Sequence, residues 1–213
     1  MIFKDRTDAG QKLAEKLEDY KGKKNVLILA LPRGGVVVAY EIAKKLNLPL
    51  DLVVPRKIGA PGNEEYAIGA ITETGEGIFD DAAINMLRVP KEYLDKKIAE
   101  EKKEARRRLK EYRKGRAPLK LKNKIIIIID DGLATGLTMR AAIKSVKKQR
   151  VKQIIVAIPV TAKDSLKVIQ EEADKVIYLD APSYFGAVGA FYENFDQTTD
   201  QEVIEITKKQ KLK

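Results

Sequence analysis

Two adjacent carboxylates follow a run of five isoleucines in the second half of the chain. Asp130 and Asp131 come directly after the run at 125–129, and a short loop rich in glycine and threonine follows at 132–138. A run of β-branched apolar residues is typical of a strand that is buried on both faces. Because ligands of open α/β sheets bind where strands lead into helices, we expect the loop to cradle a phosphate through backbone N–H groups. Two acids beside such a cradle favour a sugar phosphate, whose hydroxyls need acceptors.

The loop does not fit the two best-known phosphate-binding motifs. A Walker A loop needs a longer spacing between its glycines and a lysine after the second, whereas three residues separate Gly132 from Gly136, and Leu137 follows. A dinucleotide fingerprint needs G-x-G-x-x-G, which neither this loop nor the segment 32–35 contains. A tight turn with an ordinary helix cap is the simpler alternative, but a cap requires one acceptor rather than two adjacent acids.

The segment 126–138 resembles the PRPP-binding motif of type I phosphoribosyltransferases, in which four apolar residues, two acids and a Thr/Gly loop follow one another. That family binds 5-phosphoribosyl-1-pyrophosphate (PRPP). The resemblance implies that Asp130 and Asp131 hold the ribose hydroxyls. It implies that Mg²⁺ accompanies the pyrophosphate, with Asp130 as a ligand only through water. It also implies that the 5′-phosphate lies against Ala134, Thr135, Gly136, Leu137 and Thr138.

A second glycine-rich loop follows the apolar stretch 25–31. Gly34 and Gly35 let the backbone approach an anion closely, and Arg33 supplies a forked donor that suits phosphate. In the resembled family, the corresponding loop binds pyrophosphate and often contains a cis peptide bond that does not precede proline. We therefore expect two anion-binding loops at one edge of a sheet, with a plain turn and a solvated arginine as the alternative.

Residues 55–66 contain prolines and glycines but no apolar period, which predicts a loop long enough to act as a lid. The resemblance implies that this lid closes over PRPP and brings Arg56 and Lys57 to the pyrophosphate as catalytic cations. Adenine-type enzymes carry a Glu-Tyr pair at a similar place, so Glu65 is a candidate to contact the base. An ordinary mobile surface loop is the alternative.

After position 180 the chain becomes glycine-rich and aromatic. Exposed aromatic rings can stack on a flat base. In the resembled family, a variable hood near a chain end carries base specificity, and Phe185 with Val188 and Gly189 loosely resembles purine-type hoods. We expect one phosphoribosyltransferase-like domain over 1–213, with its core at about 1–180 and a small C-terminal hood at about 181–213. A small satellite core explains the same aromatic residues equally well.

The identity of the base is open. Ala134 stands where 6-oxopurine enzymes carry an acid and resembles the adenine-type loop, whereas Leu137 replaces the usual second glycine of that loop. The blocks at 32–35, 55–63 and 130–136 resemble a group of bacterial and archaeal proteins that are predicted phosphoribosyltransferases without an assigned substrate.

The predicted elements place these loops on one sheet. We expect strands at 25–31, 50–54, 124–129, 153–159 and 175–179, and a hairpin made by 67–72 and 77–80. Helices are expected at 5–20, 36–46, 90–116, 137–148, 162–172 and 200–209. Strands that alternate with helices favour parallel pairing and right-handed crossovers. The sequence therefore predicts an α/β fold with a doubly wound, mainly parallel sheet flanked by helices.

Composition limits both the chemistry and the compartment. The chain has 213 residues, a net charge of +10 and no cysteine, histidine or tryptophan. No disulfide, no Cys/His zinc site and no histidine acid, base or triad can therefore form. Any metal is then a hard ion held by oxygen, which favours Mg²⁺. We find no apolar signal segment or membrane-length run, and we expect a cytoplasmic protein.

Three functions remain open from the sequence. The first is a Mg²⁺-dependent phosphoribosyltransferase of nucleotide salvage, which joins PRPP to a nitrogenous base, releases pyrophosphate and forms a homodimer. The alternative is a PRPP-sensing regulator that binds RNA or DNA through its basic surface, including the charged helix at about 91–116 with Arg106, Arg107 and Arg108. A solvated helix face explains those arginines more simply. The third is another sugar-phosphate enzyme that shares the sheet.

Overall fold

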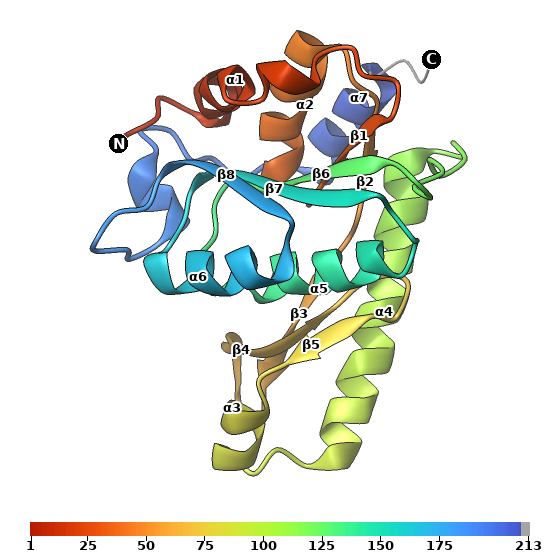
Figure 1. Ribbon diagram of the computed structural model, residues 1–213. Coiled ribbons are helices and arrows are strands. Elements are labelled where there is room, and N and C mark those ends of the chain that lie inside the picture. Colours follow the sequence, from red (N-terminus) through yellow and green to blue (C-terminus); the bar gives the residue numbers. More distant parts are fainter. Residues whose placement is uncertain (210–213) are drawn as a thin grey trace.

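Five parallel strands form the central sheet of the computed structural model, which describes residues 1–209 (Figure 1). Their order across the sheet is β2-β1-β6-β7-β8. The strands are β1 (Val26–Ala30), β2 (Leu50–Leu52), β6 (Ile125–Ile129), β7 (Gln153–Val160) and β8 (Lys175–Asp180). All neighbours pair in parallel, which confirms the fold class predicted from the sequence.

The isoleucine strand β6 lies at the centre of this sheet. Successive side chains of a strand point to opposite faces, and the isoleucines divide accordingly. Ile127 and Ile129 enter the larger core cluster on one face, whereas Ile126 and Ile128 enter the cluster on the other. The strand is therefore apolar throughout because neither of its faces meets water.

Helices cover both faces of the sheet, as Figure 1 shows. One face carries α1 (Arg6–Glu15), α2 (Gly34–Leu46) and α7 (Asp200–Lys209), and the other carries α5 (Leu137–Lys147) and α6 (Lys163–Glu172). Because the strands run parallel, the loops that follow β1 and β6 leave the same edge and lead directly into α2 and α5.

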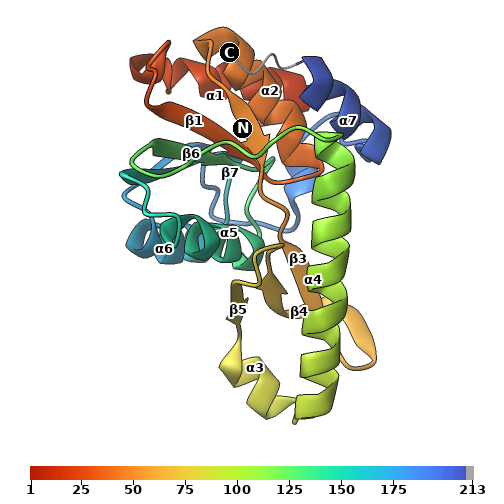
Figure 2. The same cartoon turned by 90° about the vertical axis from the view of Figure 1, so that its right-hand side faces the viewer.

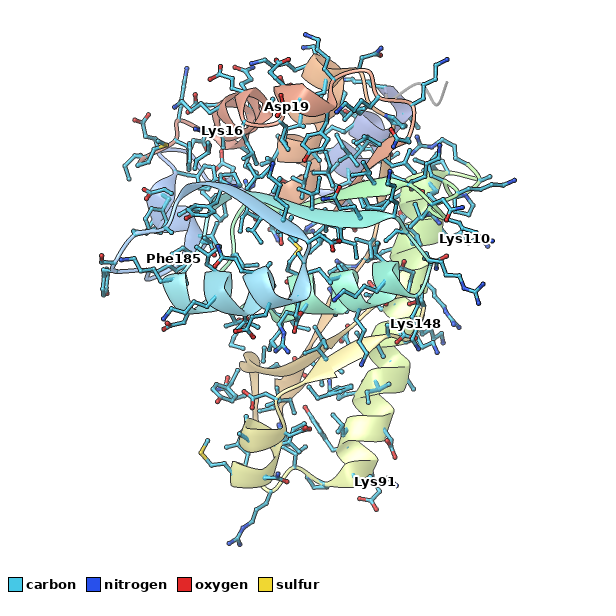
Figure 3. All side chains as sticks on the ribbon, viewed as in Figure 1. Lys16, Asp19, Lys91, Lys110, Lys148 and Phe185 are labelled. Atoms are coloured by element: carbon cyan, nitrogen blue, oxygen red, sulfur yellow. The ribbon has the colours of Figure 1, made fainter. Side chains whose placement is uncertain are left out.

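A second, smaller layer stands beyond α5 and is here called the outer unit (Figures 1 and 2). It consists of the antiparallel strands β3 (Arg56–Ala60), β4 (Asn63–Ile71) and β5 (Gly77–Phe79) with α3 (Asp81–Met86) and the long helix α4 (Lys91–Arg113). Figure 3 shows Lys91 at the end of α4 away from the main sheet and Lys110 near the sheet. Helix α4 thus spans both layers.

The stretch expected as a lid loop differs from the prediction. Residues 56–60 and 63–71 are strands joined by a turn at Pro61 and Gly62. The pairing shifts register around Gly59, where a Cβ would lie 2.5 Å from the Glu64 carbonyl oxygen. Ile58 is the one large apolar residue of β3, so the usual strand period is missing from the sequence. The hairpin predicted at 67–80 is confirmed as β4 and β5.

Leu137 joins the outer unit to the main layer. It is the first residue of α5 and is 8% exposed. Together with Ala141 it forms a buried cluster with Ala70 of β4, against which Ala67 and Ile78 also pack. The helix that begins at the glycine and threonine loop is therefore fixed directly to the antiparallel sheet.

The chain after β8 divides into two parts. Residues 181–199, here called the hood segment, contain only a short 3-10 helix at Val188–Phe191. Phe3 pairs with this segment, since its N–H donates to the Phe191 carbonyl at 2.8 Å and its carbonyl accepts from the Glu193 N–H at 2.8 Å. Helix α7 instead returns to the main core through Val203 and Ile204. The last four residues of the expected hood, 210–213, lie outside the described residues.

Within residues 1–209, none of the helices has both the length and the apolar character needed to cross a membrane.

Candidate functional site

The loops after β1 and β6 touch each other at the carboxyl edge of the sheet. A Cβ on Gly34 would lie 1.8 Å from Asp131 Oδ2, and one on Gly35 would lie 2.8 Å from the Asp130 Cα. These positions therefore have no room for a side chain. The structure brings the two predicted glycine-rich loops together, and both acids pack against the first two residues of α2.

The loop from Gly132 to Thr138, here called the phosphate loop, ends in the first turn of α5. Gly136 adopts a left-handed conformation with φ of 77° and caps the helix. The first N–H groups of a helix lack partners within it, and its N-terminus carries partial positive charge. Ala134 and Thr135 are exposed. The local geometry thus suits an anion.

The phosphate loop is anchored to the neighbouring strand. The Leu133 N–H donates to the Val160 carbonyl at 2.9 Å, and the Ala162 N–H donates to the Leu133 carbonyl at 2.9 Å. The Ser165 hydroxyl also donates to the Ala134 carbonyl. The backbone that would surround a phosphate is therefore held in place by β7 and α6.

The two acids have different surroundings. Asp130 Oδ1 accepts the Asp131 N–H at 2.9 Å. Burial, reinforced by the neighbouring Asp131 carboxylate, raises the pKa of Asp130 well above its ordinary range. Asp131 Oδ2 instead accepts a hydrogen bond from Arg6 Nε at 2.7 Å. The pair therefore combines one carboxyl with a raised proton affinity and one held by a guanidinium.

Arg6 and Tyr192 belong to this site but were not predicted from the sequence. The Tyr192 hydroxyl donates to the Asp131 carbonyl at 2.6 Å. Burial raises the Tyr192 pKa further above neutrality, so the hydroxyl keeps its proton. Arg6 and Asp131 are separated by 125 positions, and Tyr192 and Asp131 by 61. No local pattern in the sequence indicates either contact.

The loop after β1 contains a cis peptide bond between Pro32 and Arg33, as the family resemblance implied. The Arg33 side chain is 30% exposed, and its Nη1 lies 3.6 Å from Asp200 Oδ1. The same Asp200 oxygen accepts the Tyr112 hydroxyl at 2.6 Å. Arg33 is therefore held loosely at the start of α7 and remains accessible from the carboxyl edge.

Two cavities lie between the outer unit and the edge of the main sheet, with volumes of about 530 and 380 Å³. Lys57 and Glu65 line both of them. The larger cavity also meets Thr135 and Leu137, and the smaller one meets Thr138 and Pro32. The phosphate loop and the hairpin of β3 and β4 therefore form the walls of one cleft region.

Arg56 and Lys57 are neighbours on β3 and so point to opposite faces of the strand. Arg56 Nε lies 2.7 Å from Glu101 Oε2 on α4. Lys57 is exposed, and its side chain forms no hydrogen bond or ion pair with the described residues. The structure thus presents Lys57 to both cavities, while Arg56 lines the smaller of the two and is paired with α4.

Phe185 lies on the hood segment, on the side of the molecule where the phosphate loop precedes α5 (Figure 3). Its ring packs on Phe191, with centroids 5.0 Å apart. Val188 lies against Gly132, the residue that follows the two acids, because a Cβ there would be 2.4 Å from Val188 Cγ1. The satellite core that the sequence left open is present, with Phe3 and Tyr192 at its centre.

The arginines of the charged helix are engaged within the protein. Arg107 binds Glu104 and Glu111, and Arg108 binds Glu104, each with a nitrogen to oxygen distance of 2.7 Å. These two arginines lower the pKa of Glu104 to about 2 through hydrogen bonds. Arg106 donates to the Glu73 carbonyl at 2.9 Å. The simpler interpretation, a solvated helix face, accounts for this cluster, and the structure adds that its arginines are paired within the protein.

Comparison with known proteins agrees with this geometry. Residues 3–195 match the family model described as phosphoribosyl transferase domain. Two curated proteins of Mycobacterium tuberculosis, from strains CDC 1551 and H37Rv and each named "Putative phosphoribosyl transferase", are 39% identical over 203 residues. The alignment covers 95% of this chain and 46% of theirs, so the chain spans about half the length of these relatives.

A solved structure, that of TT1426 from Thermus thermophilus, is 38% identical to this chain, with a TM-score of 0.81 and 99% of both chains covered. The family match and these relatives together place the chain in a class of transferases. It belongs to the phosphoribosyl transferase family.

Proposed function

We propose that this chain transfers the 5-phosphoribosyl group of PRPP to a nitrogenous base and releases pyrophosphate. The observation that carries the proposal is the contact between the two loops at the edge of the sheet. Asp130 and Asp131 lie directly against Gly34 and Gly35, and the loop that follows them leads into α5, which Gly136 caps. The two carboxylates, which we propose as acceptors for the ribose hydroxyls, thus lie between two loops whose backbone N–H groups suit anions. The ribose of PRPP likewise lies between two anionic groups, the 5′-phosphate and the pyrophosphate.

The reaction breaks the bond between the anomeric carbon and the pyrophosphate oxygen, which keeps the electron pair. A bond forms from the base nitrogen to that carbon, and the nitrogen loses its proton to water. The transition state resembles a ribosyl cation beside a departing polyanion, so fixed charges of both signs stabilise it. Lys57 and Arg56 of β3 both line the smaller cavity, where Arg56 is also paired with Glu101 of α4. Arg33 follows Pro32, which lines the same cavity, and we propose that these three cations meet the pyrophosphate. Asp130 and Asp131 supply negative potential near the sugar.

Magnesium fits the donor set of this site, provided that the substrate supplies most of its ligands. Residues 1–209 contain no cluster of three or more acidic groups that would hold a metal ion by themselves. Mg²⁺ is usually bound through one or two carboxylates together with waters and substrate phosphates. Asp130 would hold the ion through a water molecule, and the bound ion would neutralise charge on the pyrophosphate.

The acceptor site that we propose lies between the phosphate loop and the hood segment, where Val188 packs on Gly132 and Phe185 follows β8. Glu65 lies across the cleft and is a candidate contact for the base. We further propose a cytoplasmic enzyme of nucleotide salvage that works as a homodimer, with one functional domain over residues 1–213. A chain without cysteine is compatible with that compartment.

The proposal is tested by calorimetric titration with PRPP and Mg²⁺, followed by a panel of nucleobases scored for pyrophosphate release. Binding followed by release with one base supports the transferase and names its acceptor. Binding without release for any base favours a sensor, and the absence of binding contradicts the proposed site. Asp131→Asn serves as the matched control, because it keeps the volume of the side chain while removing its charge.

A further inference from the structure

Arg6 joins three parts of the molecule at the acids. Its Nε donates to Asp131 Oδ2 at 2.7 Å, and its Nη1 donates to the Asp196 carbonyl at 2.7 Å. Its guanidinium carbon lies 3.8 Å from the centre of the Phe195 ring. Arg6 comes from the first turn of α1, whereas Phe195 and Asp196 belong to the hood segment.

The position of the guanidinium is fixed independently of Asp131. Stacking on an aromatic face and a hydrogen bond to a backbone carbonyl set the plane and the direction of an arginine fork. The Arg6 and Asp131 side chains are only 12% and 16% exposed, unlike the pairs on the surface of α4. Solvent therefore screens this contact less than it screens a surface ion pair.

The contact with Arg6 also fixes the orientation of the Asp131 carboxylate. One of its oxygens is held by Arg6, and the same oxygen lies against Gly34, where a Cβ would be 1.8 Å away. The carboxylate thus lies between the guanidinium and the loop after β1. Within residues 1–209, its second oxygen, Oδ1, accepts no hydrogen bond from an N–H group, although the Asp130 carboxyl lies within hydrogen-bond reach of the Asp131 side chain. A ligand hydroxyl can therefore donate to Oδ1.

We propose that Arg6 is a positioning residue, which holds Asp131 so that Oδ1 meets a ribose hydroxyl and which balances the charge of the two adjacent acids. This inference rests on the proposed function only in taking the ligand to be a ribose 5-phosphate. It assigns to α1 and to the hood segment a part in recognising the sugar, through Phe195 and the Asp196 carbonyl.

A simpler reading treats Arg6 as a brace between α1 and the hood segment. The two interpretations predict different changes in ligand affinity when Arg6 is replaced. Loss of a brace weakens all ligands of the site alike, whereas loss of a positioning residue weakens the ligand that carries the recognised hydroxyl more than its deoxy analogue. The difference in affinity between ribose and deoxyribose is therefore the quantity to measure.

The experiment is calorimetry on the whole chain with ribose 5-phosphate and its 2-deoxy and 3-deoxy analogues. The variants are Arg6→Gln and Arg6→Lys, with Lys12→Gln as the control. Lys12 lies on the same helix, where it pairs with Asp8 at the surface. We expect Arg6→Gln to weaken ribose 5-phosphate roughly tenfold or more and to reduce its advantage over one deoxy analogue. Arg6→Lys restores part of that advantage, and Lys12→Gln leaves it unchanged.

If Arg6→Gln weakens all three sugars equally, or changes none of them, the inference is overturned. Phe195→Leu provides a second route should Arg6→Gln fail to fold, because it removes the stacking surface and keeps the guanidinium. It should reduce the preference for ribose in the same direction. Pyrophosphate release is not part of this readout. A failure of transfer with an intact preference for ribose would thus contradict the proposed function and leave the role of Arg6 standing.

Discussion

Arg56 Nε lies 2.7 Å from Glu101 Oε2, whereas its neighbour Lys57 faces the cleft without a partner among the described residues. Both side chains line the smaller cavity, but that of Arg56 is already paired with α4. Arg56 ties the hairpin to α4, and Lys57 is left for a ligand.

Replacing these two residues should therefore give different results. We expect Lys57→Ala to lower kcat roughly a hundredfold with little change in PRPP affinity, because its ammonium acts on the departing pyrophosphate. Arg56→Ala should lower stability by about 1 kcal/mol through loss of the partly exposed ion pair. Steady-state kinetics and urea unfolding of both variants measure these effects. Equal losses of kcat and affinity for Lys57→Ala would indicate simple binding in the ground state.

The raised pKa of Asp130 predicts how stability depends on pH. The folded protein binds this proton more tightly than the unfolded chain does, so the contribution of Asp130 to stability is fully present below about pH 4. That contribution is lost as the pH rises through the raised pKa of the folded state. We therefore expect Asp130→Asn to be more stable than the natural chain at neutral pH, while binding PRPP far more weakly.

Urea unfolding of Asp130→Asn and of the natural chain between about pH 4 and pH 8 tests this sign. The stability difference should grow with pH in favour of the variant. A difference that shrinks with pH would show that the folded state prefers the ionised carboxylate.

Gly34→Ala should disrupt the sugar site without an added charge. The new Cβ would lie 1.8 Å from Asp131 Oδ2 and 2.6 Å from Arg6 Nε, so the acid, the arginine or the loop has to move. We expect affinity for ribose 5-phosphate to fall more than roughly tenfold. Gly186→Ala is the matched control, because its nearest non-adjacent atom lies 4.0 Å away. Similar affinities for the two variants would mean that the loops can move apart far enough to accept the added Cβ without loss of the site.

Leu137→Ala should loosen the attachment of the outer unit. Leu137 is 8% exposed and packs with Ala70 and Ala141, so its truncation should cost about 2 kcal/mol. Leu87→Ala, at a residue that is 44% exposed, serves as the control. Amide hydrogen exchange should show faster exchange in β4 for the first variant only. Unchanged protection of β4 would place the attachment elsewhere, for instance along α4.

The sequence predicted the main sheet because its signals are local. Five isoleucines at 125–129 can hardly be anything but a buried strand, and the glycines at 34, 35 and 136 mark turns whose backbone has no room or a positive φ. The outer unit was predicted only in part. Strand β3 has a single large apolar residue and a bulge at Gly59, so its pairing depends on β4 and on α4 rather than on its own pattern.

The sequence predicted those parts of the candidate site whose residues lie close together along the chain. It missed the contacts between residues that are far apart in sequence. Both loops and both acids lie in short motifs, so their types and spacing were sufficient to predict that they meet at one edge of the sheet. Arg6 and Tyr192 reach Asp131 from distant elements, and each lies in a stretch whose pattern is explained by packing alone. The division between Arg56 and Lys57 likewise required the strand that the sequence did not indicate.

The hood segment is attached outside the hydrogen-bond ladder of the main sheet, through the Phe3 backbone, the Tyr192 hydroxyl and the contact of Val188 with Gly132. Phe195 and the Asp196 carbonyl also contact Arg6, whereas Tyr184, near the start of the segment, is 86% exposed. We therefore expect substitution of an exposed residue such as Tyr184 to leave the folding of the sheet and its loops undisturbed. Under the proposed function, the acceptor could therefore change through mutation of exposed positions such as Tyr184, while the two loops and the two acids at the edge of the sheet stay the same.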